Sequence, residues 1–561
     1  RATRMRFDAD DRERAESVAQ RVLARGDRAD GRQQLVAWTV LAHTYFDSAR
    51  YAEAERAYGE LSRRLGADDP QRAEVTERLA ASVYRQGEAK KAAGDVTGAV
   101  QEFLRVAAVA PGSPVRATAE YDAAALLIAA QQWNEAATVL EAFRRNHPQH
   151  ELQAEVTRKL AVAYLEGGRQ REAAVELERV AAAPGEDAEV RRASLWQAAE
   201  LYATAGDVPA AQRAYADYVA RFPAPFEPAI EARHELAELA SAASDAAARK
   251  RWLDEIIAAD AAAGAARTDR SRFLAAQASL EIARPLDQVA RAVALTVPLD
   301  RSFLAKKVAL ESALAGYGRA ADYGVAPVTT AASYAMADLY RHLGRALIES
   351  QRPRDLSAEE LEQYDLLLEE QAFPFEEKAI GIHEKNAHRS AEGVYDEWVQ
   401  KSFAALAEMK PARYARAESL GDAAVSTATP PEAVVLLAAA NASLEAGRNE
   451  DAGRALEAAL VVDPANAGAL NRLGVASRRQ GRFADARASY ERAIAADPSD
   501  ADAERNLAVL LDLYLGDPAA ALAHYERHQA LTGGVDAQVG AWVVELRTRL
   551  GQVPRTAEVQ P

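Results

Sequence analysis

The sequence predicts an all-α fold, an α-solenoid of helical hairpins in two arrays that a helical middle segment joins. The composition favours helices, because the chain is 49% hydrophobic, rich in alanine and poor in strand-like runs of Val, Ile and Thr. Its 561 residues exceed what one core supports, whereas a solenoid grows by adding units that contact only their neighbours. Near the C-terminus the sequence also repeats itself after 34 residues, a period typical of stacked helical hairpins.

The 34-residue repeat rests on small, aromatic and turn-forming residues that return in register. The first copy contains Gly447, Ala452, Leu456, Ala459 and Pro464. The second copy contains Gly481, Ala486, Tyr490, Ala493 and Pro498 at the matching positions. Small residues fit where two helices cross closely, a turn glycine can take positive φ, and proline follows a helix that it cannot continue. With Leu473-Gly474 and Phe483, the second copy resembles the tetratricopeptide repeat (TPR). This resemblance implies stacked helix pairs that bind proteins or peptides.

The same pattern recurs in the N-terminal half with longer and less regular spacing, for example around Trp133 and Gly206. A last N-terminal hairpin is predicted over residues 229–260. The predicted domains are an N-terminal helix (1–32), an N-terminal array of TPR and TPR-like hairpins (33–268), a helical middle segment without the consensus (269–425), a C-terminal TPR array (426–534), and a capping helix with a tail that we expect to be disordered (535–561).

The middle segment keeps helical periodicity but loses the repeat. Ser357 followed by Glu360 is a capping-box pattern, which predicts the start of a helix. We expect this helix to end at Phe373-Pro374-Phe375. Eight carboxylates between residues 358 and 377 are interpreted as a solvated helix face. The residues from Gly421 to Pro431 are the predicted hinge before the C-terminal array.

The charge balance argues against some classes of partner. A net charge of −16, from 84 acidic and 68 basic residues, disfavours binding to nucleic acid, which requires a basic surface. No stretch approaches 18 consecutive apolar residues, so we expect no membrane span in this sequence. The first residue is Arg1 instead of Met, which leaves open an upstream signal peptide or membrane anchor.

No residue pattern supports an enzyme, a metal site or a cofactor site. The sequence has no cysteine, so thiolate chemistry and thiolate metal sites are excluded. His383 and His388 are five residues apart and would lie about 140° apart around a helix, so they cannot share a metal from one face. His524 and His528 could share a face, but no third ligand accompanies them. We therefore expect a protein that is not an enzyme and needs no cofactor.

The inner face of the C-terminal array supplies the candidate binding site, a peptide groove rich in asparagine and arginine. Its predicted residues are Asn441, Asn471, Arg472, Arg478, Arg479, Arg505 and Asn506. An asparagine side chain can bond both polar groups of an extended backbone, and arginine suits carboxylates. The pattern is similar in part to the carboxylate clamp of chaperone-binding TPR domains, with Asn441 matching and Leu437 in place of the clamp lysine. The site therefore predicts acidic segments as partners, and Trp196, on the inner surface of the N-terminal array, is a further candidate contact.

Two blocks of the middle segment, residues 355–379 and 395–407, resemble the large Gram-negative TPR proteins associated with TonB/ExbB/ExbD-type systems. The resemblance implies a periplasmic accessory of an energised outer-membrane transport or envelope-motility machine. The absence of cysteine also favours the periplasm. The alternatives are a cytoplasmic TPR adaptor or co-chaperone-like assembly factor, and the regulatory subunit of an enzyme.

Overall fold

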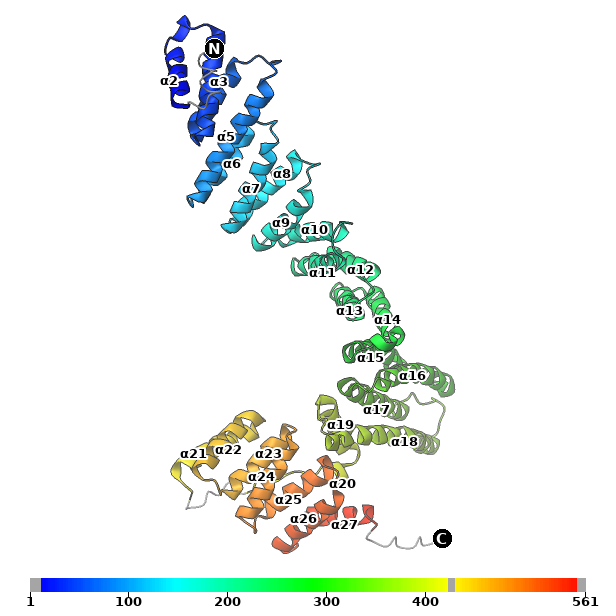
Figure 1. Ribbon diagram of the computed structural model, residues 1–561. Helices are drawn as coiled ribbons and strands as arrows, with labels where there is room; N and C mark the ends of the chain where they lie inside the picture. Colours follow the sequence, from blue (N-terminus) through cyan, green and yellow to red (C-terminus); the bar gives the residue numbers. More distant parts are fainter. Residues whose placement is uncertain (1–11, 422–428, 552–561) are drawn as a thin grey trace. The chain divides into compact units, whose positions relative to one another are not determined.

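The computed structural model describes residues 12–421 and 429–551, and every regular element in these ranges is helical (Figure 1). The all-α prediction is therefore confirmed. The chain divides into two compact units, residues 1–249 and 250–561. In both units the chain forms successive helical hairpins, so each one is a solenoid in its own right. None of the described helices combines the length and the apolar character that crossing a membrane requires.

In the first unit each helix from α2 to α13 packs against the next one along the chain. The helices are α2 (Arg12–Leu23), η1 (Gly26–Arg28), α3 (Gly31–Asp47), α4 (Tyr51–Arg64), α5 (Arg72–Ala92), α6 (Val96–Val109), α7 (Val115–Ala129), α8 (Trp133–Asn146), α9 (Gln153–Glu166), α10 (Gln170–Ala182), α11 (Ala188–Thr204), α12 (Val208–Arg221) and α13 (Phe226–Ala242), while α14 (Ala246–Ala262) crosses into the second unit. Large side chains such as Phe103 and Leu140 fill the space between helices and are fully buried or nearly so.

The second unit begins with helices that are much longer than those of the repeats. The long helices are α15 (Asp269–Ala292), α16 (Leu299–Asp322), α17 (Ala326–Ile348) and α18 (Ala358–His388), and the shorter elements beside them are η2 (Gly264–Ala266), η3 (Arg389–Glu392), α19 (Glu397–Met409) and α20 (Pro411–Tyr414). Helices α15 to α18 contain 23 to 31 residues each, whereas a repeat helix such as α24 (Phe483–Ala496) contains 14. Two such long helices cannot fit into a 34-residue unit, which explains why the repeat pattern disappears here.

Helix α18 confirms one prediction and corrects another. The Ser357 hydroxyl accepts a bond from the Glu360 amide and the Glu360 carboxylate accepts one from the Ser357 amide, as the capping box predicts. The helix nevertheless continues through Pro374 to His388, so the predicted end at Phe373-Pro374-Phe375 is wrong. A proline inside a helix costs about 3 kcal/mol. Packing offsets this cost, since Ala372 and Phe375, on either side of the proline, join a buried apolar cluster with α17.

The C-terminal array follows the predicted repeat closely. Its helices are α21 (Pro431–Glu445), α22 (Asn449–Val462), α23 (Ala467–Arg479), α24, α25 (Ala501–Val509), the π-helical turn η4 (Leu510–Tyr514), α26 (Pro518–Leu531) and α27 (Ala537–Arg549). Helix α27 lies where the capping helix was predicted, and its Trp542 and Leu546 are buried against the last repeat. Positions 422–428 of the predicted hinge and the tail beyond Gly551 fall outside the described residues.

The glycines of the repeat have the roles that their spacing predicts. Gly447 and Gly481 both lie in the turn between two helices, with φ of 72° and 75°. Gly474 lies where α23 and α24 cross, and a Cβ atom added there would come within 2.3 Å of the Tyr490 ring. The small residue at this position is therefore a steric requirement of the crossing.

The last repeat holds one extra residue, because Gly516, Ala521 and Tyr525 are each displaced by one from the 34-residue register. The structure accommodates this residue in the π-helical turn η4, where the Leu515 amide bonds the Leu510 carbonyl five residues earlier. A π-helical turn is the usual result of one residue inserted into an α-helix, and such turns are frequent at functional sites.

Candidate peptide-binding site

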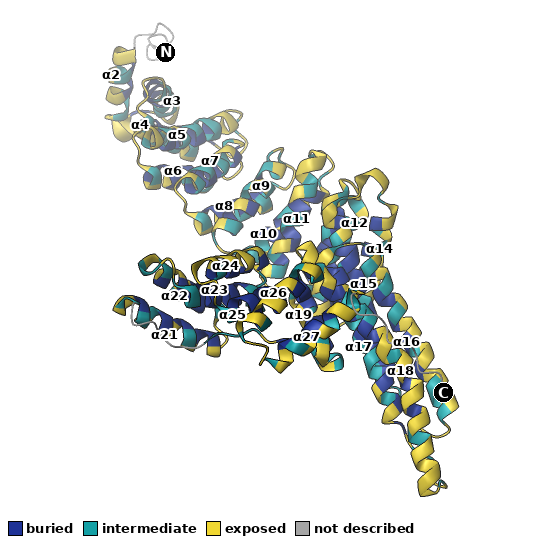
Figure 2. Ribbon diagram, turned by 90° about the horizontal axis from the view of Figure 1, so that it is seen from below, coloured by how far each residue is buried: buried dark blue, intermediate teal, exposed yellow. Residues whose placement is uncertain are grey.

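The inner face of the C-terminal array is covered by a segment of the chain itself. After α20 the chain runs through residues 415–421 without regular structure, and we call these residues the resident segment. Every residue of α23 from 469 to 477 is buried, and α25 is largely buried as well (Figure 2). Among them are the polar side chains Asn471 and Asn506, which are 1% and 0% exposed.

Asn506 binds the backbone of the resident segment with both ends of its side-chain amide. Its Oδ1 accepts a hydrogen bond from the Ser419 amide at 2.7 Å, and its Nδ2 donates one to the Ser419 carbonyl at 2.6 Å. The Asn471 amide donates to the same carbonyl at 3.3 Å and accepts a bond of 2.8 Å from Asn506. Arg505 donates to the Ala417 carbonyl at 3.0 Å. All of these hydrogen bonds to the resident segment go to its backbone atoms, so they do not depend on the side chains of that segment.

Glu418 supplies the acidic side chain of the resident segment. Its carboxylate is 3% exposed and accepts a hydrogen bond of 2.9 Å from Arg478 Nε, a second from Arg478 Nη2, and one of 2.7 Å from the Tyr490 hydroxyl. Burial lowers the pKa of Arg478, but the Glu418 carboxylate together with the Tyr514 and Tyr490 hydroxyls raises it more, and the net pKa lies above its ordinary value. Burial raises the pKa of Tyr490 well above its ordinary value, and Glu418 raises it further. Both groups therefore remain hydrogen-bond donors to the carboxylate.

Arg416 fixes the start of the resident segment. Its side chain is fully buried and forms ion pairs with Asp512 of the π-helical turn and with Glu545 of α27 at 2.5 Å. The guanidinium carbon also lies 5.6 Å and 5.5 Å from the ring centroids of Tyr525 and Trp542. A buried charge with two carboxylates and two aromatic faces around it is held far more firmly than a surface ion pair.

The structure thus brings four of the predicted groove residues onto one segment, namely Asn471, Arg478, Arg505 and Asn506. Of the others in the C-terminal array, Arg479 donates to the Leu444 carbonyl at 3.0 Å, and Arg472 is buried on α23, where burial lowers its pKa. Asn441 is half-buried on α21, and its Oδ1 has no hydrogen-bond partner within the described ranges.

Trp196 belongs to the first unit, where it packs edge-on against Tyr215 and Tyr218 with ring centroids 5.4 Å and 5.3 Å away. Its Nε1 donates to the Glu200 carboxylate on the same helix at 2.7 Å. The indole is half-buried, so part of it stays available to a ligand.

Sequence reasoning proposed the residues of a groove but did not anticipate that residues 415–421 would contact four of them. Glu418, Ser419 and Arg416 lie in a short irregular stretch between α20 and the predicted hinge. The only local hint of a structural role for this stretch is that two oppositely charged residues, Arg416 and Glu418, flank Ala417. Nothing in the pattern says that this stretch folds back onto α23 and α25, because the contacts join residues 52 to 129 positions apart.

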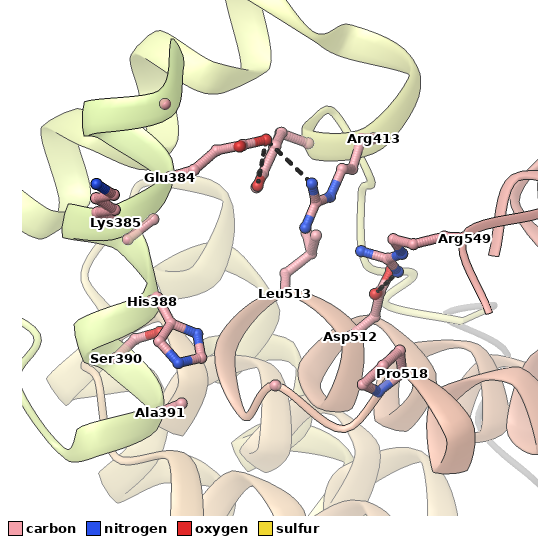
Figure 3. Close-up of a pocket in the computed structure, with 14 residues that line it drawn as sticks. Glu384, Lys385, His388, Ser390, Ala391, Arg413, Asp512, Leu513, Pro518 and Arg549 are labelled. Atoms are coloured by element: carbon pink, nitrogen blue, oxygen red, sulfur yellow. Dashed lines mark hydrogen bonds and ion pairs between the residues drawn. The ribbon is translucent and has the colours of Figure 1, made fainter. Parts of the chain in front are cut away.

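A cavity of about 630 Å³ lies between α18, η3, α20 and the last repeat (Figure 3). Four charged side chains of its lining form two ion pairs, Glu384 with Arg413 and Asp512 with Arg549. Glu384 accepts hydrogen bonds from Lys410 at 3.2 Å and Arg413 at 3.0 Å, while Asp512 pairs with Arg549. Figure 3 shows His388 facing the cavity between these two groups of charges. The described residues contain no group of three or more His, Asp or Glu side chains that could hold a metal.

The two histidines of α18 have different surroundings. His383 is completely buried, with its Nδ1 at 3.2 Å from the Ser402 hydroxyl, whereas His388 is exposed. In the last repeat, His524 contacts Glu504 at 2.5 Å, and His528 contacts the Ala501 carbonyl at 2.7 Å. His383, His524 and His528 therefore each have hydrogen-bonding partners of their own.

His383 makes the stability of the second unit depend on pH. Burial lowers its pKa from 6.5 to about 4, so the unfolded chain takes up a proton at a higher pH than the folded one. The contribution of His383 is present above pH 6.5 and is lost as the pH falls towards 4, amounting to about 3 kcal/mol. We expect chemical unfolding to show about 2 kcal/mol of this loss between pH 7.5 and 5, and a His383→Gln variant to show a smaller loss. His388→Gln is the control, and an equal pH dependence in native chain and His383→Gln would contradict the assignment.

Hairpins stacked in register, with a polar inner face that holds an extended stretch of chain, define a helical-repeat protein of the protein-interaction class. A model of the tetratricopeptide repeat matches residues 121–189, 437–501 and 478–535. These stretches are therefore TPR repeats, in agreement with the resemblance seen in the sequence. A search of curated proteins finds no match.

Several solved structures align with most of the chain at low identity and low TM-score. Naa15/Naa10 bound to HypK-THB aligns over 94% of this chain and 69% of its own, at 13% identity and a TM-score of 0.30. The P58(IPK) TPR domain aligns over 78% of this chain and 99% of its own, at 15% identity and a TM-score of 0.20. The APC/C hetero-tetramer Cut9-Hcn1 aligns over 97% and 95%, at 11% identity and a TM-score of 0.19.

Proposed function

We propose that the chain is a non-enzymatic scaffold whose C-terminal TPR array binds an extended acidic segment of a partner protein. The observation that carries this proposal is the pair of bonds from Asn506 to the Ser419 backbone, next to the ion pair of Arg478 with Glu418. The array thus already holds a segment of irregular structure that presents a glutamate, through groups that suit other segments of that kind. TPR repeats act by such contacts, with peptide in the inner face of the stacked helices.

The proposed partners belong to the bacterial envelope, and the proposed location is the periplasm. The absence of cysteine supports an oxidising compartment. The resemblance of residues 355–379 and 395–407 to TPR proteins associated with TonB/ExbB/ExbD-type systems supports an accessory role in outer-membrane transport or envelope motility. Recovery of only cytoplasmic chaperones or signalling proteins as partners would overturn this part and favour a cytoplasmic adaptor.

The test is crosslinking of the tagged full-length chain in its own cells, with identification of the attached proteins by mass spectrometry. We expect Arg478→Glu combined with Arg505→Glu to abolish the specific crosslinks, because both cations would be replaced by charges that repel an acidic segment. Arg454→Glu combined with Arg487→Glu is the matched control, since both arginines form exposed ion pairs on α22 and α24. Retention of every crosslink by the groove variant would refute the proposed site.

A further inference from the structure

The groove of the C-terminal array is filled by the resident segment, and a partner that used Asn506 and Arg478 would need the same atoms. We infer that the resident segment is a built-in competitor, which closes the groove until a partner segment with a glutamate, any residue and an aliphatic residue in sequence takes the places of residues 418–420. This inference rests on the proposed function of the groove and adds its regulation and the chemistry of its partner.

The resident segment is held unequally along its length, which allows part of it to leave. Arg416 is fully buried with two carboxylates, and this end acts as a fixed anchor. Ala417 is exposed, and Ser419, Leu420 and Gly421 are only half-buried. Residues 418–421 are held by hydrogen bonds, one ion pair and one leucine, each of which a partner can offer in the same form. Release of these residues would leave the buried charges of the anchor paired.

The contacts of residues 418–420 specify the partner. The carboxylate of Glu418 meets Arg478 and the Tyr490 hydroxyl, so an acidic side chain is required at the first position. At the second position the groove binds only the backbone of Ser419. Leu420 packs against the apolar clusters on both sides, so the third position takes an aliphatic side chain.

The decisive variant is Glu418→Arg. It replaces the ion pair between the resident segment and Arg478 by a repulsion between two arginines, and it leaves the groove residues and the Arg416 anchor unchanged. The probe is a fluorescent peptide that copies residues 417–421, Ala-Glu-Ser-Leu-Gly, added to the full chain. We expect the Glu418→Arg chain to bind it at least about tenfold more tightly than the native chain, because a larger share of its grooves is free. Glu457→Arg, the same charge change at an exposed position of α22, should bind as the native chain does.

A second peptide, Ala-Arg-Ser-Leu-Gly, differs from the first only at the glutamate and tests the specificity of the groove. We expect it to bind neither chain, because its arginine would face Arg478. Equal binding of both peptides by the Glu418→Arg chain would overturn the assigned partner chemistry. Equal affinity of native and Glu418→Arg chains for the glutamate peptide would overturn the competition.

A second measurement does not depend on the folding of the charge variant, because it uses a segment that keeps Glu418. Since the sequence has no cysteine, Ser419→Cys places one thiol in the resident segment, where the side chain is half-buried. We expect the glutamate peptide at saturating concentration to raise the rate of maleimide labelling at this cysteine several-fold. Ala446→Cys, in the exposed turn between α21 and α22, should label at a constant rate. An unchanged rate at residue 419 would show that the segment stays in place.

Failure of this inference differs from failure of the proposed function. If crosslinked partners depend on Arg478 and Arg505 while Glu418→Arg changes neither peptide affinity nor partner recovery, the groove binds partners and the segment does not compete. If the crosslinks do not depend on Arg478 and Arg505 while the peptide still displaces the segment, the groove binds such peptides but is not where partners bind in the cell.

Discussion

Replacement of Arg416 by methionine is expected to destabilise the second unit by about 3 kcal/mol, in line with the cost of breaking a buried ion pair from one side. Asp512 would stay buried with Arg549 as its remaining charged partner, and Glu545 would lose its bond of 2.5 Å. Hydrogen exchange is the suitable measurement, because it reports local free energies in a chain of several cooperative parts. The loss should appear in the amides of η4, α26 and α27.

Arg454→Met provides the control for this experiment. Arg454 pairs with Asp451 on the surface of α22 and its side chain is 70% exposed, so we expect no measurable change in exchange. If Arg416→Met left the protection of α27 unchanged, the ion pairs of Arg416 would not anchor the resident segment.

Gly474→Ala is expected to cost about 3 kcal/mol, at the upper end for overpacking of a core. The added methyl group would lie 2.3 Å from Tyr490 Cε1, and this ring is fully buried and cannot turn aside. Any shift of the ring would also weaken the bond from its hydroxyl to Glu418. We expect hydrogen exchange to show lower protection in α23 and α24, and the combination with Tyr490→Leu to recover part of the loss.

Gly453→Ala, in α22 of the same array, is the matched control. A Cβ atom there would lie 3.7 Å from the nearest atom, Arg482 Nη2, which is an ordinary contact. Alanine in this helix should stabilise the array by about 0.5–1 kcal/mol, since it restricts the unfolded chain more than glycine does. Equal effects at Gly453 and Gly474 would show that the close crossing is not what requires a glycine.

The sequence predicted the repeat architecture because its determinants are local and periodic. Gly481 marks its own turn, and Gly474 and Tyr490 specify one helix crossing within 17 residues of chain. The one-residue displacement at Gly516 was visible too, although only the structure shows that a π-helical turn accommodates it. Pro374 misled the prediction because its helical cost is local, whereas the packing that offsets it comes from a neighbouring helix.

The part of the site that lies on the repeat helices was predictable from the sequence, whereas the segment that contacts it was not. The repeat register places Asn506 and Arg478 on the inner face, and their chemistry predicts an extended acidic ligand. The segment that meets them follows no repeat, so its position depends on contacts between residues far apart in sequence. Glu418 and Arg478 are 60 positions apart, and Arg416 and Asp512 are 96 apart.

The anchor at Arg416 sets a threshold for the partners of this protein. Glu418 is only two residues from the buried guanidinium, so a released segment stays close to its groove at an effective concentration on the order of millimolar or above. A partner present as single copies at micromolar concentration would then have to bind much more tightly than the segment does. Partners that are crowded together, or that engage the chain at a second place as well, gain the same local advantage as the segment. Such a groove responds to the local density of its partners more than to their total amount.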